Sequence, residues 1–454
     1  MQEQRIVRKV ITHIHLDEAF ALYMALKYGK HIFQGIETAT RDYASHAKKP
    51  LEQIMADQEL WIGCGGDIDE HCNGKTSRLP NTSASRIMAK RINILHDPNI
   101  VSMVKEVTYF DNNIGCPKHH LGSLIKMFKM NRPGGERVAM RWALRIIQAI
   151  HVRLTRYPLP DSHEIPLGDF MEGLLKHACF EDSDAATGLR KLLEKEFVNE
   201  DPLVFGLQSI YQSLWRSSTF THIPERRQDV MDEMEHILSL LYIDQVKFHS
   251  FRRIVKSPEF DGKFRLEVEN SEGSITEVKA VATVDQADNP QAHNAMRSDQ
   301  AMITVIKGSR GQVSILGNIK LAKERGLLAS LDEGLNSLVA MLRFIDLPAA
   351  DRKTVNWDVL RCRGNCPGDP HWYLGDQNWL ALFNGTQNHD AQPTRLTLKE
   401  IRAVMLQAFV PEYVEQWKKD HQVPDNKCYV VPVQSGFQHY SSIRYMEALL
   451  FQNN

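Results

Sequence analysis

Over the first 62 residues, short runs of β-branched residues alternate with stretches in which apolar positions recur at helical spacing. Residues 5–12, 31–36 and 59–62 predict strands, and residues 17–28 and 51–56 predict helices. Strands that alternate with helices favour a parallel sheet with helices on its faces, so we expect an α/β fold here. In such sheets the ligand crevice lies beyond the carboxyl ends of the strands.

The pattern then becomes almost entirely helical. Ser83, or its neighbour Thr82, predicts the start of a helix whose apolar positions continue to residue 92. From about 119 to 255 nearly every pattern is helical, and the long amphipathic segment 226–255 predicts a helix that connects two domains.

Beyond Pro258 apolar and polar positions alternate, which predicts strands. Two hairpins are expected from strands at 263–268, 274–279, 302–306 and 312–316, with helices at 334–344 and 398–408 and a last strand at 428–433. The predicted organisation is an N-terminal α/β domain over 1–225 with a helical insertion at 150–225, a connecting helix at 226–255, and a C-terminal α+β domain over 256–454.

The overall composition limits the classes of function. A length of 454 residues is too great for one small core, which favours at least two domains. A net charge of −1 gives no global field to steer the chain onto nucleic acid or an anionic membrane. No apolar run is long enough to cross a bilayer, and the N-terminus lacks a signal pattern. The seven cysteines are scattered, with Cys362 and Cys366 four positions apart, which favours reduced thiols and a cytoplasmic protein.

Three residues of metal-ligand type alternate at the end of the first predicted strand. His13, His15 and Asp17 would project to the same side of an extended segment. Imidazole nitrogens and carboxylate oxygens together suit a divalent cation. The alternative is a polar strand-to-helix loop in which Asp17 and Glu18 are acids favoured by the helix dipole.

A second group follows the third predicted strand. Asp67, Asp69 and His71 repeat the alternation after Gly65 and Gly66, which would let the backbone turn sharply beside a metal or phosphate. The alternative is an acidic surface turn. Because both groups lie at predicted strand ends, they can converge, and carboxylates that bridge two metals would support hydrolysis by activated water.

Other polar residues extend this candidate site. Asp111 follows an apolar segment and would complete a second ion, although an Asp-Asn-Asn turn explains it equally well. His119 and His120 are adjacent, so on a helix at most one of them would face the site and contact phosphate.

The C-terminal part offers candidates for binding an anion or a base. Lys307, Arg310 and Arg395 would form an anion-binding surface, or they are solvated charges. Aromatic side chains in the same part would stack a base or pack in the core, and these are Trp372, Tyr373 and Trp379.

Together these motifs resemble the DHH-type phosphoesterase superfamily, and within it the Myg-type metal-dependent hydrolases. The N-terminal match covers about the first 130 residues and is specific in order and spacing. The segments that carry it are Thr12-His13, His15-Leu16-Asp17-Glu18-Ala19, Gly65-Gly66-Asp67, Asp69-Glu70-His71, Thr82-Ser83-Ala84 and Asp111-Asn112, with a looser match at Gln434-Ser435-Gly436-Phe437.

The resemblance implies a DHH-like N-terminal domain with two metals, Mn²⁺ or Mg²⁺, and a C-terminal domain that holds the substrate. It implies hydrolysis of phosphodiester or phosphomonoester bonds in a nucleotide or a short single-stranded nucleic acid, and several members of the family are exonucleases. The catalytic motif would be Asp69, Glu70 and His71. The metal ligands would be His13, His15, Asp17, Asp67, Asp69, His71 and Asp111. The substrate contacts would be Ser83, His119, His120, Arg310 and Arg395.

The chain also departs from the family pattern. Glu70 replaces the middle histidine of the name motif, and a carboxylate still binds manganese or magnesium. Gly63 stands where an acid opens the segment before the glycines, and Asp67 would be its substitute. Gln438-His439 stands in place of the family's Gly-Gly-His or Gly-Gly-Asn substrate loop.

Two alternatives stay open at this point. A non-catalytic relative would bind nucleotide or act as a regulatory module, with the insertion at 150–225 contacting a protein partner or a second copy of the chain. A zinc-dependent amidohydrolase would prefer a set richer in histidine, with Cys64 and Cys72 as ligands.

Overall fold

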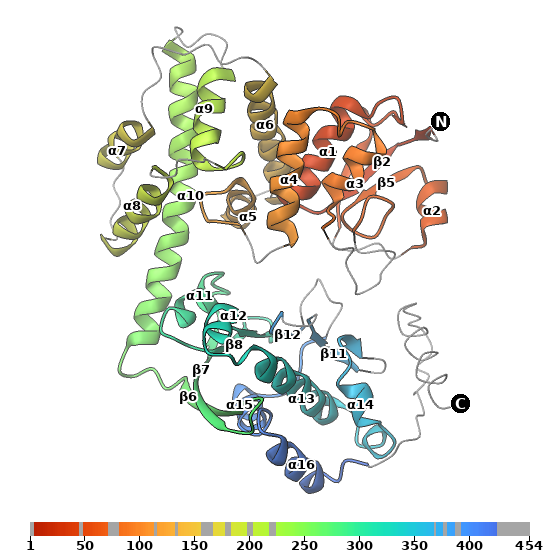
Figure 1. Ribbon diagram of the computed structural model, residues 1–454, viewed down its shortest axis with the longest axis vertical. Helices are drawn as coiled ribbons and strands as arrows, with labels where there is room; N and C mark the ends of the chain where they lie inside the picture. Colours follow the sequence, from red (N-terminus) through yellow and green to blue (C-terminus); the bar gives the residue numbers. More distant parts are fainter. Residues whose placement is uncertain are drawn as a thin grey trace. The chain divides into compact units, whose positions relative to one another are not determined.

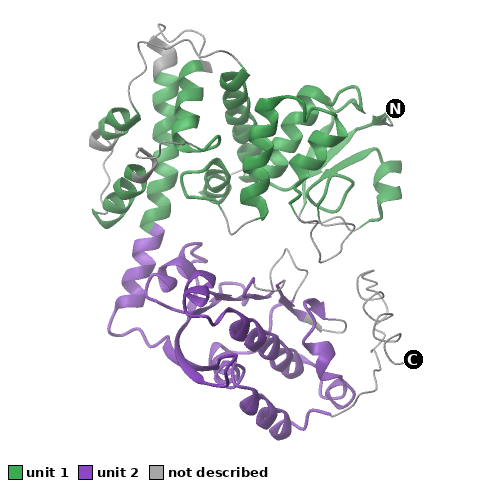
Figure 2. Ribbon diagram, viewed as in Figure 1, with its two compact units in different colours: residues 1–246 green, residues 247–454 purple. Residues whose placement is uncertain are grey.

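The computed structural model describes most of the chain. The described residues are 4–44, 49–70, 81–112, 116–131, 135–155, 167–177, 183–197, 203–217, 224–366, 369–375, 379–385 and 392–424. They form a mixed α/β structure that divides into two compact units, Met1–Val246 and Lys247–Asn454 (Figure 2). The boundary between the units lies inside the long helix α10 (Pro224–Lys256), where a connecting helix was predicted.

The N-terminal unit contains two small parallel sheets. One has the order β4-β2-β5 and the other pairs β1 with β3; the strands are β1 (Arg5–Ile6), β2 (Lys9–Thr12), β3 (Phe33–Gln34), β4 (Thr40–Tyr43) and β5 (Glu59–Ile62). All four residues of β5 are buried, as expected for a strand covered on both faces. Thr12 pairs with Ile62, so β2 and β5 end together at the carboxyl edge of their sheet.

The predicted strand at 5–12 is in fact two strands with different partners. The N–H of Val7 donates to the carbonyl of Gln34 at 2.8 Å, and the N–H of Arg8 donates to the carbonyl of Gln58 at 2.8 Å. The chain thus leaves one sheet and enters the other within two residues. The edge strand β4 was not predicted because its residues, Thr-Arg-Asp-Tyr, are polar and half exposed.

Helices cover these sheets and form one continuous core with them (Figure 1). The prediction for 17–28 is confirmed by α1 (Leu16–Tyr28), in which every residue from Leu16 to Ala25 is buried. A helix that is apolar on nearly all sides belongs in an interior, and α1 packs against α3 and α6. The other helices of the unit are α2 (Leu51–Ala56), α3 (Ala84–Arg91), α4 (Pro98–Asn112), α5 (Leu121–Asn131), α6 (Gly135–Thr155), α7 (Leu167–His177), α8 (Ser183–Phe197) and α9 (Leu207–Ser217).

The segment expected as a helical insertion shares this core. The ring of Phe205 lies 5.8 Å from the ring of Phe20 on α1, measured between centroids. Tyr211 on α9 and Leu241 on α10 belong to the same buried cluster. Phe205 and the helices α9 and α10 therefore belong to the same core as α1.

The C-terminal unit is built on a seven-stranded mixed sheet of order β10-β11-β12-β9-β8-β7-β6. All its neighbouring strands are antiparallel except β7 and β8. Both predicted hairpins are confirmed, β6 with β7 and β8 with β9. The strands are β6 (Lys263–Glu269), β7 (Ile275–Asp285), β8 (Ile303–Gly308), β9 (Val313–Gly317), β10 (Gly364–Cys366), β11 (Asp369–Leu374) and β12 (Ala381–Asn384).

Helix α13 (Leu328–Asp346) packs on this sheet and supplies much of its core. It confirms the helix predicted at 334–344 and begins earlier. The remaining helices are α11 (Ala292–Arg297), α12 (Ile319–Glu324), α14 (Trp357–Leu360), α15 (Leu398–Met405) and α16 (Pro411–Asp420), with a 3₁₀ turn at Asp351–Lys353. The strand expected at 428–433 and the Ser435-Gly436-Phe437 segment lie outside the described residues.

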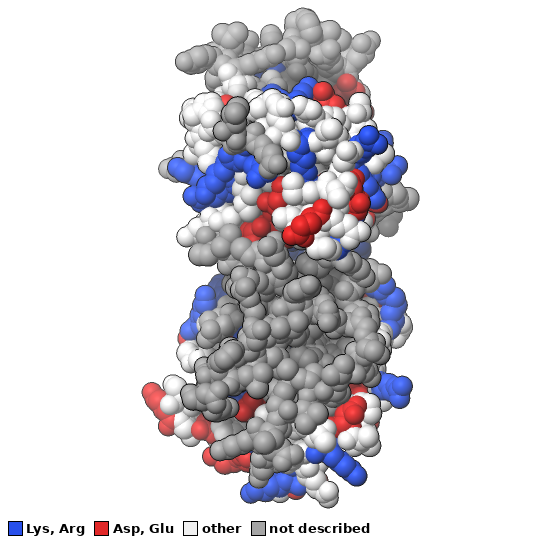
Figure 3. All heavy atoms as spheres, turned by 90° about the vertical axis from the view of Figure 1, so that its right-hand side faces the viewer, with Lys and Arg blue, Asp and Glu red and all other residues white. Residues whose placement is uncertain are grey.

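The described surface carries charges of both signs, and the described helices can be compared with the length that a membrane requires. On the face shown in Figure 3, basic and acidic side chains occur side by side, and neither sign covers the N-terminal unit. Among the described residues, every helix is too short or too polar to span a membrane.

Candidate functional site

Three carboxylates from separate elements converge beside the N-terminal sheet. One oxygen from each of Asp17, Glu70 and Asp111 lies within 4.8 Å of the others. Asp17 opens α1 after β2, Glu70 follows the loop after β5, and Asp111 lies at the end of α4. Asp17 and Glu70 are buried and Asp111 is half-buried. We call these three residues the acidic triad.

The Asp17 carboxylate is held by the N-terminus of α3. It accepts hydrogen bonds from the N–H of Ala84 at 2.6 Å and from the N–H of Ser85 at 3.0 Å. These donors would otherwise be unsatisfied at a helix start. Burial, together with the charge of Glu18, raises the pKa of Asp17 to about 6. Ionisation of Asp17 is therefore less favourable than in water, even though two N–H groups donate to its carboxylate.

Ser83 stabilises the helix start that holds the Asp17 carboxylate. It is the N-cap of α3, as predicted, and its hydroxyl accepts from the N–H of Arg86 at 3.3 Å. The same hydroxyl lies 2.9 Å from that of Thr108 on α4, and Asn112 of α4 donates to the carbonyl of Thr82 at 3.0 Å. These contacts join the helix start that holds Asp17 to the helix end that carries Asp111. Ser83 is fully buried, which favours a structural role over the expected substrate contact.

His13, His15 and Glu18 form a second polar group at the start of α1. The imidazole rings of His13 and His15 stack with centroids 5.6 Å apart. The Nδ1 atom of His15 lies 3.6 Å from Oε2 of Glu18. Burial alone would raise the pKa of Glu18, but the charges of His15 and His13 outweigh burial and lower that pKa below its ordinary value. From the sequence, the role expected for Glu18 was that of an acid favoured by the helix dipole.

The two other predicted aspartates, Asp67 and Asp69, lie in the loop after β5 and are bound by other groups of the protein. Both oxygens of Asp67 accept from Arg5 at 3.0 Å, and Arg91 lies 3.8 Å away. Asp67 is therefore turned to these arginines and is not part of the acidic triad. Asp69 is buried and accepts from the N–H of Gly65, which closes the loop. His71 and Cys72 lie outside the described residues.

His120 is enclosed by protein rather than open to a substrate. It is fully buried, its Nδ1 accepts from the N–H of Gly122 at 3.2 Å, and its Nε2 lies 3.1 Å from Glu106. Since Nδ1 accepts, the proton is on Nε2 and is donated to Glu106. Both ring nitrogens are thus engaged, which favours a structural role. His119 is half-buried in the turn before α5.

The C-terminal candidates lie on the second unit. Arg310 is exposed in the turn between β8 and β9, and Arg395 is exposed before α15. Lys307 donates to the carbonyl of Leu396 at 2.6 Å. Trp372 is a core residue, whereas Trp379 is 44% exposed. In the described part of the second unit, these contacts do not link any of the candidate side chains to one another.

Comparisons with known proteins leave the family open. No family model matches the chain, and no curated protein matches it. A structural match is an uncharacterized protein from Helicobacter pylori G27, which is 10% identical. The match covers 89% of this chain and 99% of that protein with a TM-score of 0.19. A likeness at this TM-score carries no argument about fold or function.

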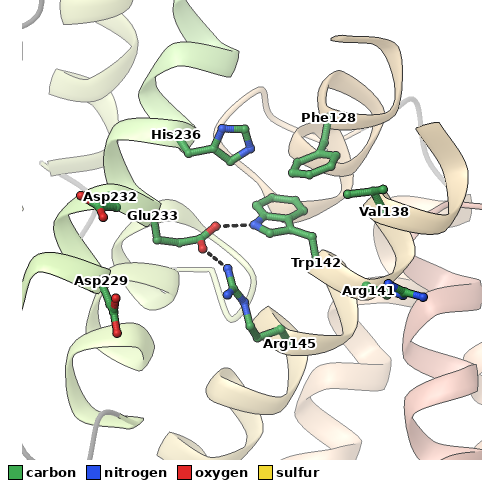
Figure 4. Close-up of a pocket in the computed structure, with 9 residues that line it drawn as sticks. All are labelled: Phe128, Val138, Arg141, Trp142, Arg145, Asp229, Asp232, Glu233 and His236. Carbon is green, nitrogen blue, oxygen red and sulfur yellow. Dashed lines mark hydrogen bonds and ion pairs between the residues drawn. The ribbon is translucent and has the colours of Figure 1, made fainter. Parts of the chain in front are cut away.

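A hollow that sequence reasoning missed lies among the helices of the N-terminal unit (Figure 4). It measures about 610 Å³ and is lined by Phe128, Val138, Arg141, Trp142, Arg145, Asp229, Asp232, Glu233 and His236. Glu233 accepts from the indole N–H of Trp142 and from Arg145. The signal was available, because positions 138, 141, 142 and 145 of α6 and positions 229, 232, 233 and 236 of α10 follow helical spacing.

Cys64 does not fit the zinc alternative. Its thiol is buried and donates to the carbonyl of Ile11 at 3.7 Å. Burial and the charges of Glu18 and Asp69 raise the pKa of this thiol far above its usual range. A zinc ligand is a thiolate, so this environment disfavours Cys64 as a ligand.

Proposed function

We propose that this protein is a metal-dependent phosphoesterase centred on the acidic triad. The observation that carries the proposal is the convergence of Asp17, Glu70 and Asp111 within 4.8 Å beside the carboxyl edge of a parallel sheet. That edge is where α/β folds bind their ligands. The resemblance to the Myg-type DHH hydrolases supports the same chemistry, because it implies Asp17 and Asp111 as metal ligands, and Glu70 stands at the middle position of the family's name motif.

The donor set suits a hard divalent cation. Carboxylate oxygens are the ligands that Mn²⁺ and Mg²⁺ prefer, and imidazoles suit Mn²⁺ less strongly but are compatible with it. Three carboxylates so close together repel one another, and the raised pKa of Asp17 reflects burial and a neighbouring charge. A bound cation would relieve both costs. Asp17, Glu70 and Asp111 would hold it.

The cation would supply a Lewis acid that activates water and stabilises charge on the phosphoryl oxygens. The chain's own contribution is positioning. Ala84 and Ser85 fix the Asp17 carboxylate through their N–H groups, and Ser83 joins that helix start to α4. Partners behind the ligands of a metal site hold them in place and tune their affinity.

The experiment is hydrolysis of a small panel with and without Mn²⁺. The panel contains single-stranded RNA, single-stranded DNA, a dinucleotide and a nucleoside monophosphate, so that the size and the class of the substrate are tested together. Mn²⁺-dependent cleavage of any member supports the proposal. Folded protein that binds Mn²⁺ tightly and cleaves none of them would contradict a general phosphoesterase, and protein that binds no Mn²⁺ would contradict the metal site itself.

A second candidate function is a non-catalytic binding module. The observation that favours it is the hollow between α5, α6 and α10, which is lined by none of the predicted site residues. Trp142 lies in its wall, so a fluorescence change that Trp142→Phe abolishes would report an occupant (Figure 4). A ligand or protein that quenches Trp142 in protein without hydrolytic activity would favour this function over the enzyme.

A further inference from the structure

A histidine links two hydroxyl side chains on one face of the C-terminal sheet. His293 lies on α11, which packs against β8 (Figure 1). Its Nδ1 lies 2.7 Å from Oγ1 of Thr304 on β8, and its Nε2 lies 2.7 Å from Oγ of Ser314 on β9. The three residues thus form one chain of hydrogen bonds that joins a helix to two neighbouring strands.

The direction of these hydrogen bonds follows from the single proton of each hydroxyl. Thr304 donates its proton to the carbonyl of Leu316 at 3.0 Å, so it accepts from the Nδ1–H of His293. Burial and the charge of Arg297 lower the pKa of His293 to about 3, so the imidazole is neutral and its Nε2 accepts the proton of Ser314. A serine that donates to a histidine, which a third group orients, is the arrangement of a nucleophile and its base.

Ser314 faces away from the main core of the C-terminal unit. The residues on either side of it in β9, Val313 and Ile315, are buried in the core that includes α13. Successive residues of a strand point to opposite faces of the sheet, so Ser314 projects to the other face. Ser314 and His293 are each half-buried there. Part of each side chain's surroundings therefore remains open to a small substrate.

The groups around Ser314 suit an aromatic ester. Phe383 of β12 pairs with Ser314 and projects to the same face. The ring of Trp379, which is 44% exposed, lies 5.8 Å from that of Phe383, measured between centroids. Arg297, one helical turn after His293, has a buried Nε–H that donates to no acceptor among the described residues. The rings offer an apolar surface to an aryl group, and the guanidinium favours negative charge that develops on a carbonyl oxygen.

The low basicity of His293 limits the leaving groups that this pair can serve. General-base catalysis weakens as the pKa of the base falls below the working pH, and the pKa of His293 is about 3. A phenol, with a pKa of about 10, is a much stronger acid than an alcohol or an amine, so phenolate leaves more readily. An aryl ester is therefore a suitable substrate class, whereas a peptide is not.

We infer that Ser314 is the nucleophile of a second, metal-independent site that hydrolyses aryl carboxylic esters. Its Oγ forms a bond to the carbonyl carbon as its proton passes to Nε2 of His293. The bond from that carbon to the phenolic oxygen then breaks, and the phenolate takes the proton from the imidazolium. Water attacks the acyl-serine by the same route, which releases the carboxylic acid and restores the Ser314 hydroxyl. The competing explanation is that His293 only ties α11 to the sheet.

The test is labelling of the full-length protein with a fluorophosphonate probe in EDTA, followed by peptide mass spectrometry. A serine that a base activates forms a bond to the phosphorus of this probe and displaces fluoride. We expect one label per chain, at Ser314, and hydrolysis of phenyl acetate that stops when Ser314 is labelled. No label at Ser314 in folded protein would overturn the inference. Because EDTA removes divalent cations, this result is independent of the proposed function.

Two variants separate a nucleophile from a structural hydrogen bond. Ser314→Ala should abolish hydrolysis of phenyl acetate, and His293→Gln should lower its rate by about 100-fold, the usual lower limit for a general base. Ser271→Ala removes an exposed serine between β6 and β7 and should leave the rate unchanged. An unchanged rate in folded Ser314→Ala would overturn the inference. The label on the wild type decides the question if neither variant folds.

Discussion

The ammonium of Lys27, an exposed residue of α1, lies 2.9 Å from Nδ1 of the fully buried His151 of α6. An ammonium only donates, so Nδ1 must be an acceptor and the ring proton must be on Nε2. Tyr23 also lies 2.8 Å from Nδ1, and Tyr28 lies 3.2 Å from Nε2. Burial and the charge of Lys27 together lower the pKa of His151 to about 4. The imidazole is therefore neutral in the folded protein.

His151 should make the protein less stable in mild acid. In the unfolded chain it takes up a proton as the pH falls through 6.5, whereas the folded form resists protonation until about 4. The unfolded state thus binds more protons in this window, so stability falls from pH 6.5 towards pH 4. Between pH 7.5 and pH 5.0, urea unfolding of the wild type should lose about 2 kcal/mol more than that of His151→Gln. The exposed His96→Gln is the control and should behave like the wild type.

Arg343 should be essential to the stability of the C-terminal unit. Its guanidinium is fully buried and donates to four carbonyl oxygens, those of Leu360, Cys362, Gly364 and Trp372. Arg343→Met would leave these acceptors unsatisfied, so we expect a loss of about 3–5 kcal/mol in urea unfolding. Arg343→Lys keeps the charge but can serve fewer acceptors, and its loss should be intermediate. A cost below about 1 kcal/mol for Arg343→Met would show that the carbonyls find other donors.

Asp17→Asn should abolish Mn²⁺-dependent hydrolysis and leave the fold intact. The amide removes the negative charge that would hold the cation, and kcat/KM should fall by about 100-fold or more. The fold should persist, because the amide oxygen of Asn still accepts from one of the two N–H groups that hold Asp17, and only the other N–H loses its acceptor. The panel member that the wild type cleaves is the assay substrate. Glu52→Gln, which changes an exposed carboxylate of α2, is the control and should keep full activity. Activity retained in folded Asp17→Asn protein would refute the assignment of this residue.

Ser83→Ala should weaken the structure rather than substrate binding. Removing the N-cap of α3 and the contact to Thr108 should cost about 1–2 kcal/mol in metal-free protein. Ser102→Ala changes an exposed serine on α4 and should cost nothing measurable. If Ser83 instead contacted the substrate, the variant would raise KM without this loss of stability.

The elements with long periodic patterns were predictable from the sequence. The helices α1 and α10 and the strands β6, β8 and β9 are within a few residues of their predicted bounds, whereas β7 continues six residues past its predicted end. The break between β1 and β2 was not predictable, because it depends on Val7 pairing with Gln34 and Arg8 with Gln58. Those partners are distant in the sequence, and the residue pattern around Val7 and Arg8 does not indicate them.

The candidate site was predictable only in part, because some of its contacts join residues that are distant in the sequence. Asp17 was proposed because it follows a predicted strand and Asp111 because it follows an apolar segment, and the structure places both in the acidic triad. Asp67 seemed equivalent by spacing, yet Arg5, 62 positions earlier, takes its carboxylate. The placement of Glu18 beside Gly63 depends on the space between a helix and a strand end, which spacing along the chain does not encode.

The last ten residues of α10 belong to the C-terminal unit and contribute two side chains to its core. Phe251 and Val255 are buried there against Val281, Met296 and Ile306. Any attempt to express the two units separately must therefore cut a continuous helix and choose which product keeps its apolar end. A cut after Lys256 would give the N-terminal product an exposed apolar stripe, whereas a cut near Val246 would leave the C-terminal product its own packing helix. A protease that needs an extended segment should find no easy site at this boundary, since the backbone there is already hydrogen-bonded.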